Sequence, residues 1–163
     1  MGLEDRRGDN GTTLVEFAMV APLLLILIFG IVEFARAASE LTAVRTAARE
    51  GARFATTVGD DLDDPHYVDC EAIFAAAREK AVIGSLQQIT VEWEGGYKCS
   101  DPAAGDDIGP PAAEDLVTGT EITVTVSTEF DSVVPLVETF LDGAELESRQ
   151  TRQVFKGLVE DTG

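Results

Sequence analysis

The stretch Gly11-Thr12-Thr13-Leu14-Val15-Glu16-Phe17 stands between a short charged leader and an apolar run that continues to Val32. Glu16 lies five residues beyond Gly11, at the edge of that run. A carboxylate beside hydrocarbon is costly unless it is neutralised, paired or functional. The placement of this single acid therefore indicates a role beyond the stability of a helix.

The apolar run is long enough to cross a bilayer. Leu14–Phe34 carries only Glu16 and Glu33, one at each margin. At about 1.5 Å per residue, its length corresponds to roughly 31 Å, the thickness of one hydrocarbon core. Because the run is apolar all round, it lacks the polar face of a surface helix. We therefore expect a leader over residues 1–11 and a transmembrane helix over residues 12–34.

Two alternatives to a membrane anchor remain open. One is the buried core helix of a soluble protein. The other is a secretory signal peptide, whose hydrophobic region precedes a small-residue cleavage site such as Ala35-Arg36-Ala37. The leader Met1–Gly11 has no hydrophobic region of its own, so a cut after Gly11 would leave the apolar helix on the mature chain.

Pro22 and Gly30 interrupt the apolar run without ending it. Proline removes one backbone hydrogen bond and favours a kink, yet membrane helices tolerate both residue types. We expect a helix kink at these two positions.

The helix is expected to continue over residues 35–57, beyond the bilayer. Apolar and small residues step by three and four along one face, at Leu41, Val44, Ala48, Gly51 and Ala55. Arg45, Arg49 and Arg53 are spaced by four, and like charges at this spacing repel. They are either a solvated face or a contact with an acidic surface of this chain or of a neighbour.

The remaining residues, 58–155, are expected to form one small α+β domain. Residues 89–93 and 121–130 alternate as half-buried strands do, and residues 144–155 form a weaker third strand. Residues 69–85 and 132–141 are predicted helices, 95–116 a mobile loop and 156–163 a frayed tail. The predicted fold is a long N-terminal helix packed on a small antiparallel sheet of about three strands, with two shorter helices.

The two cysteines, Cys70 and Cys99, are expected to form a disulfide in a non-cytoplasmic domain, with two free buried thiols as the alternative. The acidic loop over residues 58–69 lacks the glycine and terminal glutamate of an EF-hand, and no zinc spacing is present. His66, the one histidine, is expected at the surface without chemistry. We therefore expect no metal or cofactor.

The net charge of −18 argues against nucleic acid as a partner, because phosphates require lysine and arginine. No phosphate loop, nucleophile elbow or zinc-helix motif indicates an enzyme. Charge alone gives a conflicting orientation, since arginines flank the apolar run on both sides. The cysteine pair and the leader favour a cytoplasmic N-terminus and an extracytoplasmic domain.

Three segments together resemble a known family: the stretch beginning at Gly11, then Phe29–Phe34, then Ala47–Arg53. They resemble TadE-like proteins, the minor pseudopilins of tight-adherence (Tad/Flp) pilus systems, over about residues 11–55. The resemblance implies cleavage by a membrane prepilin peptidase after Gly11, with recognition at Gly11, Thr12, Glu16 and Phe17. It also implies assembly with other pilins and pseudopilins by membrane machinery, in the cytoplasmic membrane or a surface pilus.

The tetrapeptide Val-Glu-Phe-Ala occurs at Val15–Ala18 and again at Val32–Ala35, but Gly30 precedes Glu33 by three residues and not five. We expect only the first copy to direct cleavage. The competing functional class is a single-pass, membrane-anchored binding or signalling domain with no filament role. Such an anchor would need neither the leader glycine nor Glu16.

Overall fold

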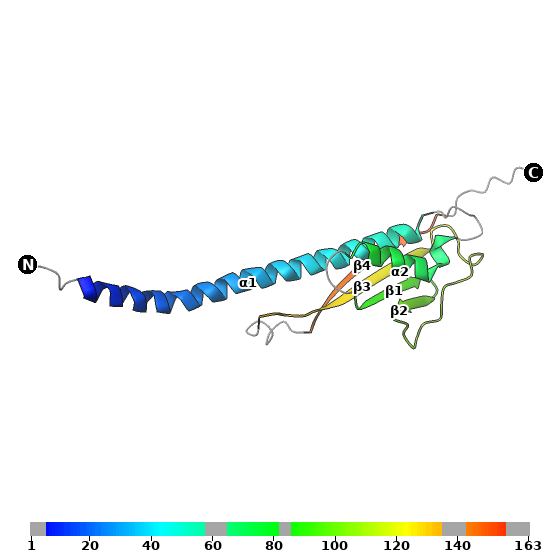
Figure 1. Ribbon diagram of the computed structural model, residues 1–163. Helices are drawn as coiled ribbons and strands as arrows, with labels where there is room; N and C mark the ends of the chain where they lie inside the picture. Colours follow the sequence, from blue (N-terminus) through cyan, green and yellow to red (C-terminus); the bar gives the residue numbers. More distant parts are fainter. Residues whose placement is uncertain (1–5, 58–64, 82–85, 135–142, 156–163) are drawn as a thin grey trace, which may run out of the picture.

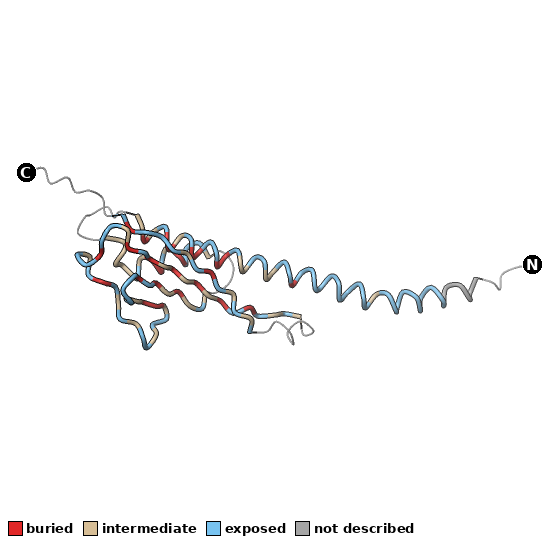
Figure 2. Tube along the Cα trace, turned by 180° about the vertical axis from the view of Figure 1, so that it is seen from behind, coloured by how far each residue is buried: buried red, intermediate tan, exposed pale blue. Residues whose placement is uncertain are grey.

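A computed structural model of the chain describes residues 6–57, 65–81, 86–134 and 143–155. Its longest element is α1, Arg6–Ala55, a helix of 50 residues whose N-terminal half projects away from the rest of the molecule (Figure 1). Figure 2 shows that this half is exposed, whereas the C-terminal half has a buried side. The expected transmembrane helix and its continuation are therefore one uninterrupted helix.

Four antiparallel strands form a single sheet in the order β2-β1-β3-β4. The strands are β1 Gln88–Trp93, β2 Lys98–Asp101, β3 Glu121–Phe130 and β4 Ala144–Gln153. The alternation in β3 places Ile122, Val124 and Val126 on the buried face. Thr123 and Thr125 lie on the opposite, polar face, where Thr123 is hydrogen-bonded to Thr151 of β4.

Two helices cover the same face of this sheet (Figure 1). The C-terminal half of α1 packs on β3 and β4, and α2, Cys70–Glu79, packs on β1 and β2. The side of α1 that enters the core is made of small residues, namely Val44, Ala47, Ala48, Gly51, Ala52 and Ala55. The predicted stripe is thus buried apart from Leu41, which is only half-buried.

A short 3-10 helix, η1 His66–Val68, lies between α1 and α2 in the chain and contacts both α1 and the sheet. The indole Nε1 of Trp93 donates a hydrogen bond of 2.8 Å to the Tyr67 carbonyl oxygen. The His66 ring stacks on Phe54 of α1 with its centroid 4.2 Å away. His66 is therefore half-buried and has a packing role, although it was expected to be a simple surface residue.

The sheet has four strands where the sequence predicted about three. The additional strand, β2, lies inside the segment 95–116 that was expected to be a loop, and it pairs with β1. Four residues are too few to display a strand's alternation, so this segment forms a strand only because it pairs with β1. The hydrogen bonds that the Asp107 carboxylate accepts from Ser100 and Ala104 order the residues after β2. The expected mobility of 95–116 stays a prediction.

The helices also differ from the expectation. Asp69 begins α2, because its carboxylate accepts a 2.9 Å hydrogen bond from the Ala72 amide. The helix ends at Glu79, before the predicted end at residue 85. One shorter α-helix is described, not two: most of the helix predicted over 132–141 lies outside the described residues, as do the acidic residues 58–64 and the tail 156–163.

Candidate functional site

The predicted processing residues lie on the exposed N-terminal part of α1. Gly11, Thr12, Glu16 and Phe17 are all exposed. Apart from its chain neighbours and the local helix backbone, no described group lies within 4 Å of the position that a Cβ on Gly11 would take. Thr12 and Glu16 are four residues apart, which places them on one face of the helix. Among the described residues, Glu16 has no ion-pair partner. The segment is therefore sterically open to another protein.

α1 begins at Arg6 and continues through Gly11, so residues expected to belong to the cleaved leader are part of the same helix. A peptide bond inside a helix must be locally unwound before a protease can cut it. Glycine is about 1 kcal/mol less favourable than alanine in a helix interior. Gly11 thus marks a weak point in this turn.

The apolar part of α1 has no protein cover. Its large side chains are between 45% and 77% exposed, from Leu14 to Phe34. This part of the helix is long and apolar enough to cross a membrane, and its candidate window is not buried. Such a continuous apolar surface marks a membrane or a protein interaction site. The exposure of this part of α1 argues against the core-helix alternative and is consistent with a single membrane span or a signal sequence.

Pro22 and Gly30 do not interrupt α1 (Figure 1). No atom outside the local helix backbone lies within 4 Å of a Cβ built on Gly30. Both residues are exposed, and the kink predicted there stays a prediction.

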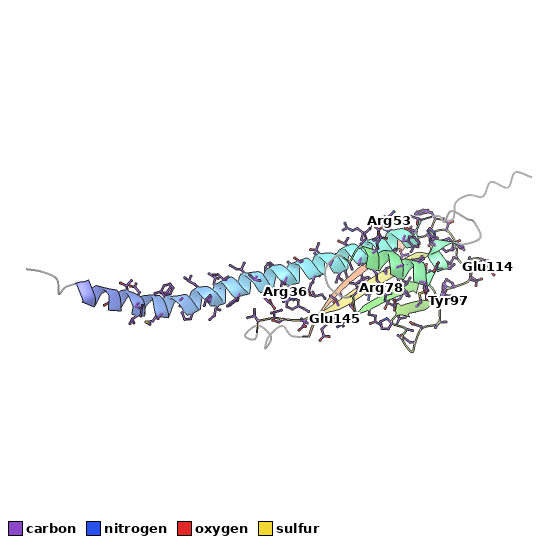
Figure 3. The ribbon with its side chains drawn as sticks, in the orientation of Figure 1. Arg36, Arg53, Arg78, Tyr97, Glu114 and Glu145 are labelled. Atoms are coloured by element: carbon purple, nitrogen blue, oxygen red, sulfur yellow. A yellow bond between two sulfur atoms is a disulfide. The ribbon has the colours of Figure 1, made fainter. Side chains whose placement is uncertain are left out.

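Glu33 forms a contact that the sequence did not reveal. It is only 3% exposed, and its Oε1 accepts a 2.9 Å hydrogen bond from the Val133 amide. Arg36 lies 3.3 Å from the Glu33 carboxylate, and its other terminal nitrogen donates to the Asp131 carbonyl oxygen at 3.3 Å. Figure 3 shows Arg36 on α1 beside the segment that follows β3. Residues 131–134 are thereby held against the helix.

A weak sequence signal for this contact existed. Glu33 ends the apolar run and has Arg36 one turn later, which suggests a local ion pair. The partner in the loop lies a hundred residues away, and nothing in either segment indicates the other.

The three arginines predicted as an assembly contact do not behave alike. Arg53 donates two hydrogen bonds to Glu50, at 3.0 and 2.6 Å. These bonds lower the pKa of Glu50 and raise the pKa of Arg53. Arg45 and Arg49 are exposed, and neither has an ion-pair partner within the described residues. Arg53 is therefore compensated within α1, whereas Arg45 and Arg49 are not.

Cys70 and Cys99 form a disulfide, which confirms the pairing and removes the free-thiol alternative. The bond joins the first residue of α2 to β2. An ion pair between Arg78 and Asp101 joins the same two elements further along. Together these links hold the short edge strand under α2.

Within the part of the chain that the structure describes, no group of three or more histidine, cysteine or acidic side chains could hold a metal ion. The polar face of the sheet carries one tight ion pair, in which the Lys98 Nζ lies 2.7 Å from the Asp106 carboxylate. This pair raises the pKa of Lys98 and lowers that of Asp106. It links β2 to the loop that follows this strand.

The fold and the site define a class: an α+β protein whose long N-terminal helix presents an uncovered apolar half and packs its other half on an antiparallel sheet. Residues 11–53 match the family model described as TadE-like protein. Over this segment, about a quarter of the chain, the sequence is similar to TadE-like proteins. Searches of curated proteins and of solved structures found no match.

Proposed function

We propose that the chain is a minor pseudopilin that a prepilin peptidase cuts between Gly11 and Thr12, and that takes part in the assembly of a Tad/Flp-type pilus. The observation that carries the proposal is the open segment of α1. It combines the glycine, an acid five residues later and an uncovered apolar helix in the segment that matches the family. The apolar half holds the subunit in the bilayer before assembly and packs with other pilins afterwards.

The mature N-terminus tests this proposal directly. We expect mass spectrometry of the protein from cells with an active prepilin peptidase to find Thr12 as the first residue. Gly11→Glu should block cutting, because a charged side chain cannot occupy the place where glycine passes the protease. Gly8→Glu places the same charge three residues upstream and should be processed. A chain that begins at Met1 in cells with active peptidase would support the plain membrane anchor instead.

The second Val-Glu-Phe-Ala copy, at Val32–Ala35, should not direct cutting. Its glycine is at the wrong distance, and Glu33 is already bound by the Val133 amide and Arg36. Glu16, by contrast, is exposed and has no ion-pair partner among the residues that the structure describes. The two acids therefore differ in their availability to a second protein.

We assign Glu16 to assembly and not to folding. In low-dielectric surroundings a carboxylate needs a cation, and a buried ion pair can set the register between helices. After cutting, the ammonium of a neighbouring subunit's Thr12 is a suitable partner. We call the α+β domain that α1 forms with the sheet and α2 the outer domain. Glu16→Gln should leave the disulfide and the thermal unfolding of this domain unchanged, and it should reduce incorporation into pili. Normal incorporation of this variant would contradict the assignment.

Arg45 and Arg49 are assigned to a contact with an acidic surface of a neighbouring subunit. They are exposed and have no ion-pair partner among the described residues, in a chain whose net charge is −18. Arg45→Glu with Arg49→Glu should reduce cross-linking to other pilins in the assembly. Arg53→Glu is the matched control, since Arg53 already pairs with Glu50. Equal loss in both would show that the effect is not specific to the unpaired arginines.

The domain after α1 is placed outside the cytoplasm, with the N-terminus inside. The disulfide supports this orientation, because such bonds persist in oxidising compartments. Protease added to intact spheroplasts should remove the outer domain and leave α1 in the membrane. Protection of the domain until the membrane is broken would reverse the topology.

A further inference from the structure

We propose that the segment Asp131–Val134 is a second membrane contact, in which the Val133 side chain enters the interface of the same bilayer that α1 crosses. The partner is the lipid surface itself. This inference rests on the single membrane span of the proposed function. It adds a second attachment site on the outer domain, at the end of β3.

The level of the bilayer surface follows from the charges on α1. No charged residue occurs between Phe17 and Val32, and Glu33 is the first charge after this run. Residues 12–32 rise about 31 Å along a helix, which matches one hydrocarbon core. A carboxylate that is hydrogen-bonded to polar backbone belongs at the polar boundary and not within the hydrocarbon. Glu33 therefore marks the outer edge of the bilayer.

The loop is attached at this level. The Val133 amide donates to Glu33 Oε1 at 2.9 Å, and Arg36 donates to the Asp131 carbonyl oxygen at 3.3 Å. The Arg36 guanidinium also lies 5.8 Å from the centre of the Phe130 ring, at the end of β3. Glu33 is only 3% exposed, so these groups cover its carboxylate almost completely. The loop and Glu33 must share one depth.

Val133 is an exposed apolar residue of this segment. Its backbone is held by Glu33, yet its side chain is 72% exposed. On α1, the residue next to Glu33 is Phe34, which is 77% exposed. Apolar side chains at this depth are stabilised by insertion into the headgroup and acyl boundary. The protein leaves the Val133 side chain exposed, and the lipid that surrounds α1 therefore covers it.

Tryptophan fluorescence in lipid vesicles tests the proposal. The chain contains one tryptophan, Trp93, which is 3% exposed in the core and gives a constant background. Val133→Trp in the full chain, reconstituted in phosphatidylcholine vesicles, should lose most of its added emission when the acyl chains are brominated near the headgroup. Phe29→Trp, inside the apolar run, should be quenched most by bromines placed deeper.

The matched control is Val117→Trp. Val117 is 67% exposed, similar to Val133, but precedes the opposite end of β3. It should show no quenching at any bromine depth. A further variant, Glu33→Ala with Val133→Trp, removes the acceptor of the loop amide and should show weaker quenching than Val133→Trp alone.

Suppose that Phe29→Trp is quenched but Val133→Trp is quenched no more than Val117→Trp. This result would overturn the second membrane contact and leave the membrane span intact. The same result would follow if a neighbouring subunit covered Val133. Absence of quenching for Phe29→Trp would show that α1 is not inserted, and would overturn the membrane span together with this inference.

Discussion

Gly51 of α1 and Val124 of β3 approach so closely that a Cβ built on the glycine would lie 3.1 Å from Val124 Cγ1. The same Cβ would lie 3.3 Å from the Ala77 Cβ of α2. This glycine is therefore the point where α1, α2 and the sheet meet. The close approach explains why the only helix breaker within the packed half of α1 is tolerated there.

Gly51→Leu should destabilise the outer domain. A leucine side chain cannot fit at this junction without displacing Val124 or α2, and overpacking typically costs about 1–3 kcal/mol, occasionally more. The midpoint of thermal unfolding, followed by circular dichroism in detergent, should fall. Gly30→Leu is the matched control, because no group lies within 4 Å of its Cβ position. An unchanged midpoint for Gly51→Leu would contradict the packing.

Val124→Asp should unfold the outer domain or bring it close to unfolding. Val124 is fully buried, so the new carboxylate would lose its hydration without an available partner. Penalties of several kcal/mol are a large part of the roughly 5–15 kcal/mol that stabilises a typical native protein. Thr125→Asp, on the polar face beside Arg149, should have little effect on the unfolding midpoint. Similar midpoints for the two variants would mean that β3 does not face the core.

Reduction of the Cys70–Cys99 bond should lower the unfolding midpoint. The two residues are 29 apart in the chain, and closing a loop of this size contributes roughly 3–4 kcal/mol in the chain-entropy model. The Cys70→Ser, Cys99→Ser double variant should start from the lower midpoint and show no response to reductant. Alkylation of both thiols without reductant, in protein purified from cells, would show that the bond does not form there.

Acid should weaken the link between Glu50 and Arg53. The hydrogen bonds from Arg53 lower the pKa of Glu50, so this contribution to stability is present above the unfolded-state pKa and is lost as the pH falls through the folded-state pKa. Since the pair is partly exposed, the effect should be small. Between neutral and acid pH, the midpoint of thermal unfolding should fall less for Glu50→Gln than for the parent chain. Equal losses would mean that the pair has no role in stability.

Several elements could be predicted from local sequence. The apolar run of α1 has one composition over many residues, and β1 and β3 alternate with a period of two, so their identity needs no distant partner. The cysteine pair was predicted from its count and context. The strand β2 could not be predicted, because a four-residue segment becomes a strand only through its pairing with β1. Positive φ angles at Gly95 and Gly96 make the tight turn that permits this pairing.

The candidate site divides in the same way. Gly11, Thr12 and Glu16 lie within one short segment, and their spacing alone indicates a common helix face. The role of Glu33 depends on Val133, a hundred residues later, and could not be deduced from either segment. Similarly, the sequence presents Arg45, Arg49 and Arg53 as equivalent, whereas the structure gives only Arg53 a partner in Glu50.

The sequence by itself determined the long apolar helix, the spacing of its predicted processing residues and the alternation of the main strands, because each depends on residues that are neighbours along the chain. Only the tertiary structure decided that Glu33 is buried, that β2 completes the sheet and that a Cβ at Gly51 would crowd Val124 and Ala77. These properties arise from segments far apart in the chain. Burial, strand pairing and close packing exist only after the loops between such segments have closed.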